Sequence, residues 1–206
     1  MKLVLIGAPG CGKGTRAKFI SEKFGIPQIS TGDLFRENLK NNTEYAEEIR
    51  SFIDKGNLVP DELTVKLLKS RLEKDDCVNG YILDGFPRTL EQAKYLDEIN
   101  HVLFFDCSED VLIERLSGRR VCKGCGEIYH AVYIKPKVEG KCNNCSEELI
   151  QRDDDKEEVI VDRLKVYGKQ TEPLLGFFEG KIKRFDASLE LEESIQEIIN
   201  FLESFK

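Results

Sequence analysis

Short apolar runs alternate with longer amphipathic stretches along most of the chain. Apolar runs of about four to six residues suit buried strands, and the longer stretches have the spacing of amphipathic helices. This alternation is typical of a parallel sheet with helices on both faces, so we predict an α/β fold. The predicted strands are Lys2–Ile6, Gln28–Ser30, Tyr81–Leu83, Val102–Phe105 and Lys183–Phe185. The predicted helices are Gly14–Phe24, Asp33–Leu39, Glu44–Lys55, Asp61–Lys74, Leu90–Ile99, Glu109–Arg119, Lys156–Phe178 and Leu191–Phe205.

The starts of three helices carry recognisable signals. Thr31 or Asp33 is expected to cap the second helix, because short polar side chains accept hydrogen bonds from free backbone N–H groups. Pro60-Asp61 opens another helix, and Ser108 before two acidic residues opens a third.

Two long stretches interrupt the alternation of strands and helices. Residues 31–59 add two short helices between predicted strands, and residues 120–155 contain four cysteines and several glycines. Connections of this length are functional or disordered, and the cysteines favour an ordered structure. We therefore expect a core with two insertions. The core consists of residues 1–30, 60–119 and 156–206, and the insertions are residues 31–59 and 120–155.

Composition and charge exclude several classes of protein. The chain has 206 residues, of which 40% are hydrophobic and 33% charged, and its net charge is −7. This length allows one sizeable core with an inserted subdomain. The acidic balance argues against nucleic-acid binding. The apolar runs are too short to span a bilayer, and the first leads into a glycine-rich loop, so we expect a cytoplasmic protein without membrane partners.

A glycine-rich loop, GAPGCGKGT at residues 7–15, follows the first predicted strand and opens the first helix. In this setting glycines let backbone N–H groups turn towards phosphate, and the helix N-terminus adds partial positive charge. Lys13 supplies a charge for the β- and γ-phosphates. Gly14 stands where a hydroxyl residue commonly follows the lysine, and Thr15 comes one residue later. The loop predicts a nucleotide site; the alternative is a glycine-rich turn without a ligand.

Four cysteines form two Cys-x-x-Cys pairs separated by sixteen residues: Cys122, Cys125, Cys142 and Cys145. This spacing is typical of a zinc site, and four thiolates leave no open coordination position, so the metal would be structural. Two disulfides or four free thiols are the alternatives, and iron could replace zinc. His130 is then a packing or surface residue, since four cysteines already satisfy zinc. The other cysteines, Cys11, Cys77 and Cys107, are expected to be small apolar fillers.

Several motifs occur in the order shown by the nucleoside monophosphate kinases. They are the loop at residues 7–15, Ser30-Thr31-Gly32-Asp33, Asp84-Gly85-Phe86-Pro87-Arg88-Thr89, Gly118-Arg119-Arg120, Arg152-x-Asp154-Asp155 and Arg163. The chain therefore resembles this family over almost its whole length. Its long second insertion is similar to that of the long-lid adenylate kinases.

The resemblance implies a P-loop fold in which residues 31–59 form a helical AMP-binding flap and residues 120–155 a zinc-ribbon-like lid. Residues implied in ATP binding are Gly10, Cys11, Gly12, Lys13, Gly14, Thr15, Arg115, Arg119, Ile128, Tyr129 and Leu189. Residues implied in AMP binding are Thr31, Arg36, Asn57, Leu58, Val59, Gly85, Phe86, Pro87, Arg88, Gln92, Arg152 and Arg163. Those implied in phosphoryl transfer are Lys13, Asp84, Arg88, Arg119, Arg152 and Arg163.

The chemistry of three of these side chains suits the implied roles. A guanidinium such as that of Arg88 binds two phosphate oxygens at once, and Arg88 lies just past the end of a predicted strand, where open α/β sheets bind ligands. The Gln92 amide offers a donor and an acceptor, which match the edge of adenine. Asp84 is expected to organise the water shell of Mg²⁺, or else to be a turn residue.

The resemblance implies reversible transfer of a phosphoryl group from MgATP to AMP, giving two ADP, with Mg²⁺ and a structural Zn²⁺ as cofactors and a monomeric protein. One alternative is a kinase of another nucleoside monophosphate, or one that uses GTP as donor. A second alternative is a P-loop and zinc-ribbon module that binds RNA or protein. Arg36 and Arg88 argue against the module, because a nucleotide switch needs no second nucleotide site.

Overall fold

The computed structural model of the chain describes residues 1–96 and 98–205. Its main sheet is parallel, with the strand order β2-β3-β1-β4-β8. The strands are β1 (Lys2–Gly7), β2 (Gln28–Ser30), β3 (Tyr81–Asp84), β4 (His101–Asp106) and β8 (Ile182–Asp186). The predicted five-stranded parallel sheet is confirmed, and each predicted strand end lies within one residue of the observed end.

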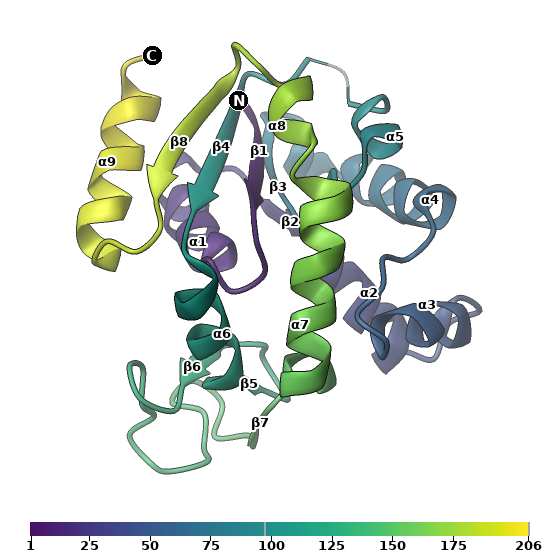
Figure 1. Cartoon of the computed structure of the whole chain (residues 1–206), viewed down its shortest axis with the longest axis vertical. Coiled ribbons are helices and arrows are strands. Elements are labelled where there is room, and N and C mark those ends of the chain that lie inside the picture. Colours follow the sequence, from purple (N-terminus) through teal and green to yellow (C-terminus); the bar gives the residue numbers. More distant parts are fainter. Residues whose placement is uncertain (97, 206) are drawn as a thin grey trace.

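Successive residues of the central strand β1 enter different hydrophobic layers. Leu3 and Leu5 pack on one face with α1 (Lys13–Phe24) and α9 (Leu191–Glu203). Val4 and Ile6 pack on the other face with α4 (Asp61–Leu72), α5 (Leu90–Ala93) and α8 (Leu174–Phe177). Figure 1 shows helices on both sides of the sheet. Because both faces are covered, the strands are continuously apolar instead of alternating with polar residues.

The helix that follows β2 begins two residues before its predicted start at Asp33. This helix, α2, spans Thr31–Lys40, and its cap is Ser30, whose hydroxyl accepts a hydrogen bond from the Asp33 N–H at 3.2 Å. The prediction of Thr31 or Asp33 as the cap is therefore wrong. Thr31 instead donates its hydroxyl proton to the Gly85 carbonyl at 2.8 Å, a long-range contact that local sequence does not reveal.

The predicted helix at 156–178 is not continuous. Helix α7 (Glu157–Val166) passes into a π-helical turn at Tyr167–Thr171, and α8 begins only after Pro173. Proline lacks a backbone N–H, and its ring clashes with the preceding turn of a helix. The prediction followed the helical periodicity through this residue and was wrong there.

Five other helices are shorter than predicted, and two of them, α4 and α9, simply end two residues early. Helix α3 covers Ala46–Ile53 of the stretch predicted from residue 44 to 55. Helix α5 ends at Ala93, and the predicted remainder includes residue 97, which lies outside the described residues. Helix α6 (Glu109–Ser117) stops because Arg119 begins a strand. Within the described residues, no helix is long and apolar enough to cross a bilayer.

Residues 31–59, which we call the flap, contain α2 and α3 and have a hydrophobic cluster of their own. Phe35, Ile49 and Val59 are buried in this cluster together with Leu63 from α4. The flap is thus held by its own side chains and by one helix of the core, an arrangement that suits movement as a unit.

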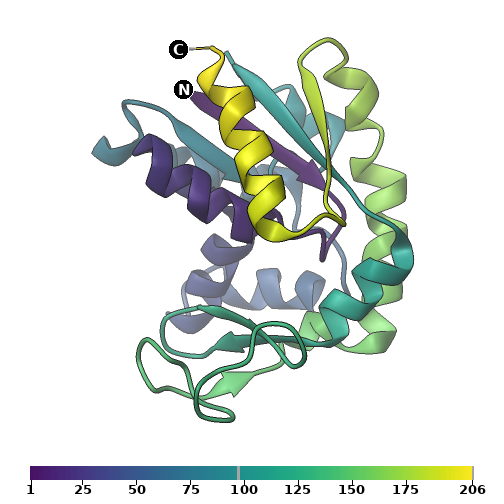
Figure 2. The same ribbon diagram turned by 90° about the vertical axis from the view of Figure 1, so that its left-hand side faces the viewer.

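Residues 120–155, which we call the lid, contain strands that the sequence pattern did not predict. Strand β5 (Arg119–Cys122) pairs in antiparallel fashion with β6 (Ile128–His130) and β7 (Leu149–Ile150). These strands are too short to give a clear period of two. The lid lies at the end of the molecule opposite the N-terminus, beyond the arrowheads of β4 and β8 (Figures 1 and 2).

Candidate functional site

A cleft of about 1230 Å³ lies where the strands of the main sheet end, and the core, the flap and the lid all contribute to its walls. Open α/β sheets bind ligands at this edge. Of the residues predicted from sequence, the cleft is lined by Gly10, Gly12, Lys13, Gly14, Thr15, Thr31, Arg36, Asn57, Leu58, Val59, Asp84, Gly85, Pro87, Arg88, Gln92, Arg115, Arg119, Ile128, Tyr129, Arg152, Arg163 and Leu189. The structure therefore brings together residues that are far apart in the sequence.

Two predicted binding residues do not line the cleft. The side chains of Cys11 and Phe86 are buried in the hydrophobic layers on the two faces of the main sheet. They hold the phosphate loop and the turn after β3 against the core, so any contact of theirs with a nucleotide would have to come from the backbone.

The glycine-rich loop between β1 and α1 has the conformation that its sequence predicts. Gly10 and Gly12 have φ angles of 88° and 84°, which side-chain-bearing residues rarely adopt. A Cβ atom at Gly14 would lie 3.3 Å from Asp84 Oδ2, which gives a physical reason for glycine at this position. Lys13 donates from Nζ to the carbonyl oxygens of Gly7 and Ala8 at 2.6 and 2.9 Å.

Arg16, which the sequence analysis did not select, braces the phosphate loop from behind. Its side chain is buried, and it donates to the Cys11 carbonyl at 3.1 Å and to Ser194 Oγ at 2.8 Å. It also donates to the Ala187 carbonyl at 3.4 Å, and Arg115 donates to the same carbonyl at 2.8 Å. Its spacing of three residues from Lys13, on the same helix, was the only sequence signal for this role.

Arginines from three parts of the chain converge on the middle of the cleft. Burial and the neighbouring charge of Arg163 lower the pKa of Arg88 to about 10. Burial, then the charges of Arg36 and Arg119, lower the pKa of Arg152 to about 9. The buried Nε of Arg152 has no hydrogen-bond partner among the described residues. Such a cluster of like charges fits a polyanionic ligand such as a polyphosphate.

Asp155 joins two of these arginines. Its carboxylate is fully buried and accepts from Arg119 Nε and Nη2 at 2.7 and 2.5 Å. It also accepts from Arg163 Nη1 at 2.9 Å, and the neighbouring Asp154 forms an ion pair with Arg163 at 3.2 Å. Asp155 thus connects the first residue of the lid sheet to α7.

At the flap end of the cleft, Arg36 and Gln92 are held in place by acidic partners. Arg36 donates to Asp33 Oδ1 at 2.5 Å within α2. Gln92 donates from Nε2 to Asp61 Oδ1 at 2.7 Å, and its Oε1 accepts from the Arg88 backbone N–H at 2.7 Å. Asp61 was seen in the sequence only as a helix start, so its contact with Gln92 was missed.

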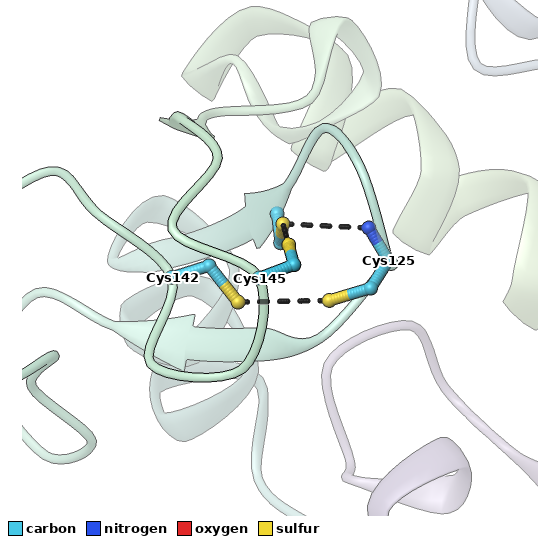
Figure 3. A group of neighbouring side chains, drawn as sticks. Cys125, Cys142 and Cys145 are labelled. Atoms are coloured by element: carbon cyan, nitrogen blue, oxygen red, sulfur yellow. Dashed lines mark hydrogen bonds between the residues drawn. The ribbon is translucent and has the colours of Figure 1, made fainter.

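The lid carries a cluster of four cysteines, and Figure 3 shows the side chains of Cys125, Cys142 and Cys145 directed towards one another. The sulfur atoms of these three and of Cys122 all lie within 4.8 Å of one another. The Cys122–Cys145 and Cys125–Cys142 sulfur distances are 3.3 and 3.5 Å. These distances exceed a disulfide bond of about 2.05 Å and approach the separation of about 3.8 Å expected for sulfurs around tetrahedral zinc. The cysteines therefore fit a four-thiolate metal site.

Side chains of the lid pack around this cluster. Tyr129 is buried against Cys122 and Cys142, and its hydroxyl lies 3.5 Å from the Cys142 sulfur, although the residue also lines the cleft. His130 is buried too: its Nδ1 accepts from the backbone N–H groups of Val132 and Tyr133. Of the two roles expected for His130, packing or surface, its burial supports packing, and it is not among the residues of the cysteine cluster.

Comparison with known proteins gives the family. A family model described as Adenylate kinase matches residues 5–183. A protein of Acetivibrio thermocellus named Adenylate kinase is 51% identical, with both chains fully covered. The chain belongs to the adenylate kinase family. Two further adenylate kinases, from Clostridium tetani and Ruminiclostridium cellulolyticum, are 47% and 48% identical over 98% of this chain and 98% and 99% of their own.

Membership of the adenylate kinase family agrees with the different residues found at the two ends of the cleft. A phosphate loop at one end and a flap with its own arginine at the other suit an enzyme that brings two nucleotides together. The resemblance found in the sequence motifs is thus confirmed, and the binding module that lacks a second nucleotide site has no support.

Proposed function

We propose that this phosphotransferase of the adenylate kinase family transfers the terminal phosphoryl group of MgATP to AMP, reversibly, and gives two ADP. ATP would occupy the end of the cleft formed by the phosphate loop and the lid, and AMP the end formed by the flap. The observation that carries this proposal is the convergence of Arg88, Arg119, Arg152 and Arg163 between these two ends. Four guanidinium groups beside Lys13 offset the charge of two polyphosphates held close together.

The chemistry needs positioning more than proton transfer. The acceptor is a phosphate oxygen, which is largely ionised at neutral pH because the second pKa of a phosphomonoester is about 6. No general base is therefore required. Arg88, half-buried beneath the flap and donating from Nε to the Gly85 carbonyl at 2.9 Å, is placed to hold the acceptor phosphate. Lys13 would exchange its present carbonyl partners for phosphate oxygens of the donor.

Adenylate kinases use Mg²⁺ with ATP, and the cleft offers a carboxylate for it. Asp84 ends β3 next to the phosphate loop, where its Oδ2 accepts a hydrogen bond from Gln28 Nε2 at 3.0 Å. Thr15 lines the same cleft. When bound, the ion would neutralise charge that develops on the phosphates. Asp84 and Gln28 would orient its water shell.

The four cysteines are proposed to hold a structural zinc ion. The four thiol groups leave no position for water or substrate, so the ion would not take part in the transfer. The lid has a hydrophobic cluster of only a few residues, including two of the cysteines themselves. Because so small a core cannot stabilise an ordered lid, a metal would supply the missing free energy.

The flap and the lid are proposed to close over the nucleotides and exclude water, which would otherwise hydrolyse ATP. Lys18 of α1 and Glu127 of the lid both line the cleft, and Lys18 Nζ forms an ion pair with Glu127 Oε2 at 3.0 Å. The remaining properties expected of this enzyme are a cytoplasmic location, a monomeric state and no nucleic-acid or membrane partner. These expectations rest on the acidic composition of the chain and on its resemblance to the nucleoside monophosphate kinases.

The test is a phosphotransfer assay with purified protein. MgATP or MgGTP is mixed in turn with AMP, GMP, CMP or UMP, and the products are resolved by anion-exchange chromatography. Rapid ADP formation from MgATP and AMP, with little loss of ATP when no acceptor is present, is the expected result. Loss of ATP that does not depend on an acceptor, or no transfer to any monophosphate, would refute the proposal.

A further inference from the structure

A ring of hydrogen bonds surrounds the side chain of Gln92 at the flap end of the cleft. Its Nε2 donates to Asp61 Oδ1 at 2.7 Å, and its Oε1 accepts from the Arg88 N–H at 2.7 Å. The second oxygen of Asp61 accepts from Thr89 Oγ1 at 2.9 Å, and Thr89 Oγ1 accepts from the Gln92 N–H at 3.1 Å. Gln92 is 1% exposed, although it contributes to the wall of the cleft.

These partners allow the carboxamide only one orientation. If the Gln92 amide were rotated by half a turn, its NH₂ group would face the Arg88 N–H, and its oxygen would face the Asp61 carboxylate. One donor would then face another donor, and one acceptor would face another acceptor. This would happen at a buried site, where unpaired polar groups are most costly. The backbone N–H of Arg88 fixes the oxygen side, and Asp61 fixes the nitrogen side.

The fixed carboxamide keeps part of its capacity for a ligand. A carboxamide has two N–H donors and two acceptor lone pairs, of which Asp61 and Arg88 occupy one each. One donor and one acceptor remain, in a fixed order. On its Watson–Crick edge, a 6-aminopurine presents an amino donor beside a ring-nitrogen acceptor, and a 6-oxopurine presents the reverse. A carboxamide that cannot rotate therefore distinguishes the two bases.

We infer that Asp61 is a positioning residue for base selection, because it locks the Gln92 carboxamide in the orientation that pairs with a 6-aminopurine and rejects a 6-oxopurine. The inference rests on the proposed function and on the expectation, made from the sequence, that the Gln92 amide reads the edge of the acceptor base. Thr89 supports the lock from the far side of the carboxylate. A site built on such hydrogen bonds discriminates strongly, since the wrong base leaves buried polar groups unpaired.

The test compares AMP with IMP, which has the same ribose phosphate and a 6-oxo group. Dissociation constants are measured by calorimetry without ATP, and kcat/KM is measured with MgATP, for the wild type and for Asp61→Leu. The Leu side chain removes the acceptor on the nitrogen side, so that only the Arg88 N–H still opposes the rotated carboxamide. We expect the preference for AMP over IMP to fall at least about tenfold, the equivalent of losing one to two hydrogen bonds.

Three further variants separate positioning from a structural role. Asp61→Asn keeps an oxygen that can accept from Gln92 Nε2. Because this hydrogen bond is retained, the preference for AMP over IMP is expected to stay within about threefold of the wild type. Glu62→Leu removes the exposed acid beside it in the first turn of α4 and is expected to leave the preference unchanged. Asp61→Ala repeats the test if the Leu variant does not fold.

The outcomes distinguish this inference from the proposed function. A wild-type protein that phosphorylates no monophosphate would refute the function itself. A Gln92→Leu variant with undiminished AMP preference would show that Gln92 does not read the base, and so would overturn the inference while transfer to AMP still stands. Folded Asp61→Leu or Asp61→Ala protein that binds AMP and IMP more weakly by the same factor would overturn the role of Asp61 alone.

Discussion

Replacement of Asp155 by alanine should destabilise the protein strongly, because it removes a buried charge that two arginines share. Its carboxylate is fully buried and accepts three hydrogen bonds from Arg119 and Arg163, at 2.5–2.9 Å. The arginine side chains are only 16% and 14% exposed, so water cannot easily replace the lost partner. In the variant, Arg119 would lose its carboxylate partner, and Arg163 would keep only its ion pair with Asp154.

The size of the effect follows from this geometry. Removal of one partner from a buried ion pair costs about 3–5 kcal/mol, because the remaining charge is left uncompensated. Proteins of this size unfold with a free energy of about 5–15 kcal/mol, so the loss would be a large fraction of the total. A change of that size corresponds to a fall in melting temperature of roughly 6–20 °C.

The assay is urea denaturation of the wild type and of Asp155→Ala, followed by circular dichroism. Asp153→Ala is the matched control, because Asp153 belongs to the same turn but forms an exposed ion pair with Lys156. Exposed pairs contribute about 0–1 kcal/mol, so this variant should resemble the wild type. A loss of less than about 1 kcal/mol for Asp155→Ala, equal to that of the control, would refute the view that Asp155 ties the lid to α7.

Three other predictions test the site. Arg88→Ala should lower kcat/KM for AMP about 10²–10³-fold, as loss of a transition-state donor does, and near-wild-type kinetics would exclude Arg88 from the transfer. Purified protein should contain one zinc ion per chain by atomic absorption. Cys142→Ser should lose the ion and melt at a lower temperature, whereas Cys77→Ser should keep it; equal zinc content in both variants would contradict the site. Burial alone would raise the pKa of Asp154, but nearby cations, first Arg163, hold it below its usual range. The stability that Asp154 contributes is therefore complete above its unfolded pKa of about 3.9 and is lost as pH falls through the lower folded value. The difference in unfolding free energy between wild type and Asp154→Asn should shrink towards pH 3, and a difference that does not depend on pH would contradict the assignment.

Features encoded over short stretches were predictable from the sequence. The five strands were found because each is an uninterrupted apolar run, and the phosphate loop because its glycines lie between such a strand and a helix. The cysteine spacing predicted the four-sulfur cluster for a similar reason, since two tight turns bring each pair to one point. The interruption at residues 31–59 likewise contains two short helices, α2 and α3, as predicted.

Local signals failed where neighbouring residues compete or where elements are very short. The periodicity of residues 156–178 hid the break at Pro173, and Ser30 displaced Thr31 as a cap because Thr31 is held by Gly85 instead. The lid strands contain two to four residues, too few for alternation to be visible.

The sequence by itself determined the sheet, the phosphate loop, the metal-site cysteines and the family resemblance, because each of these depends on residues close together in the chain. Only the tertiary structure decided which partners hold the functional side chains. Arg16 meets Ser194 across 178 positions, Arg119 meets Asp155 across 36, and Gln92 meets Asp61 across 31. Contacts of this kind arise when α1 meets α9, β5 meets the turn at Asp153–Asp155, and α5 meets α4, and no local pattern of hydrophobic and polar residues records them.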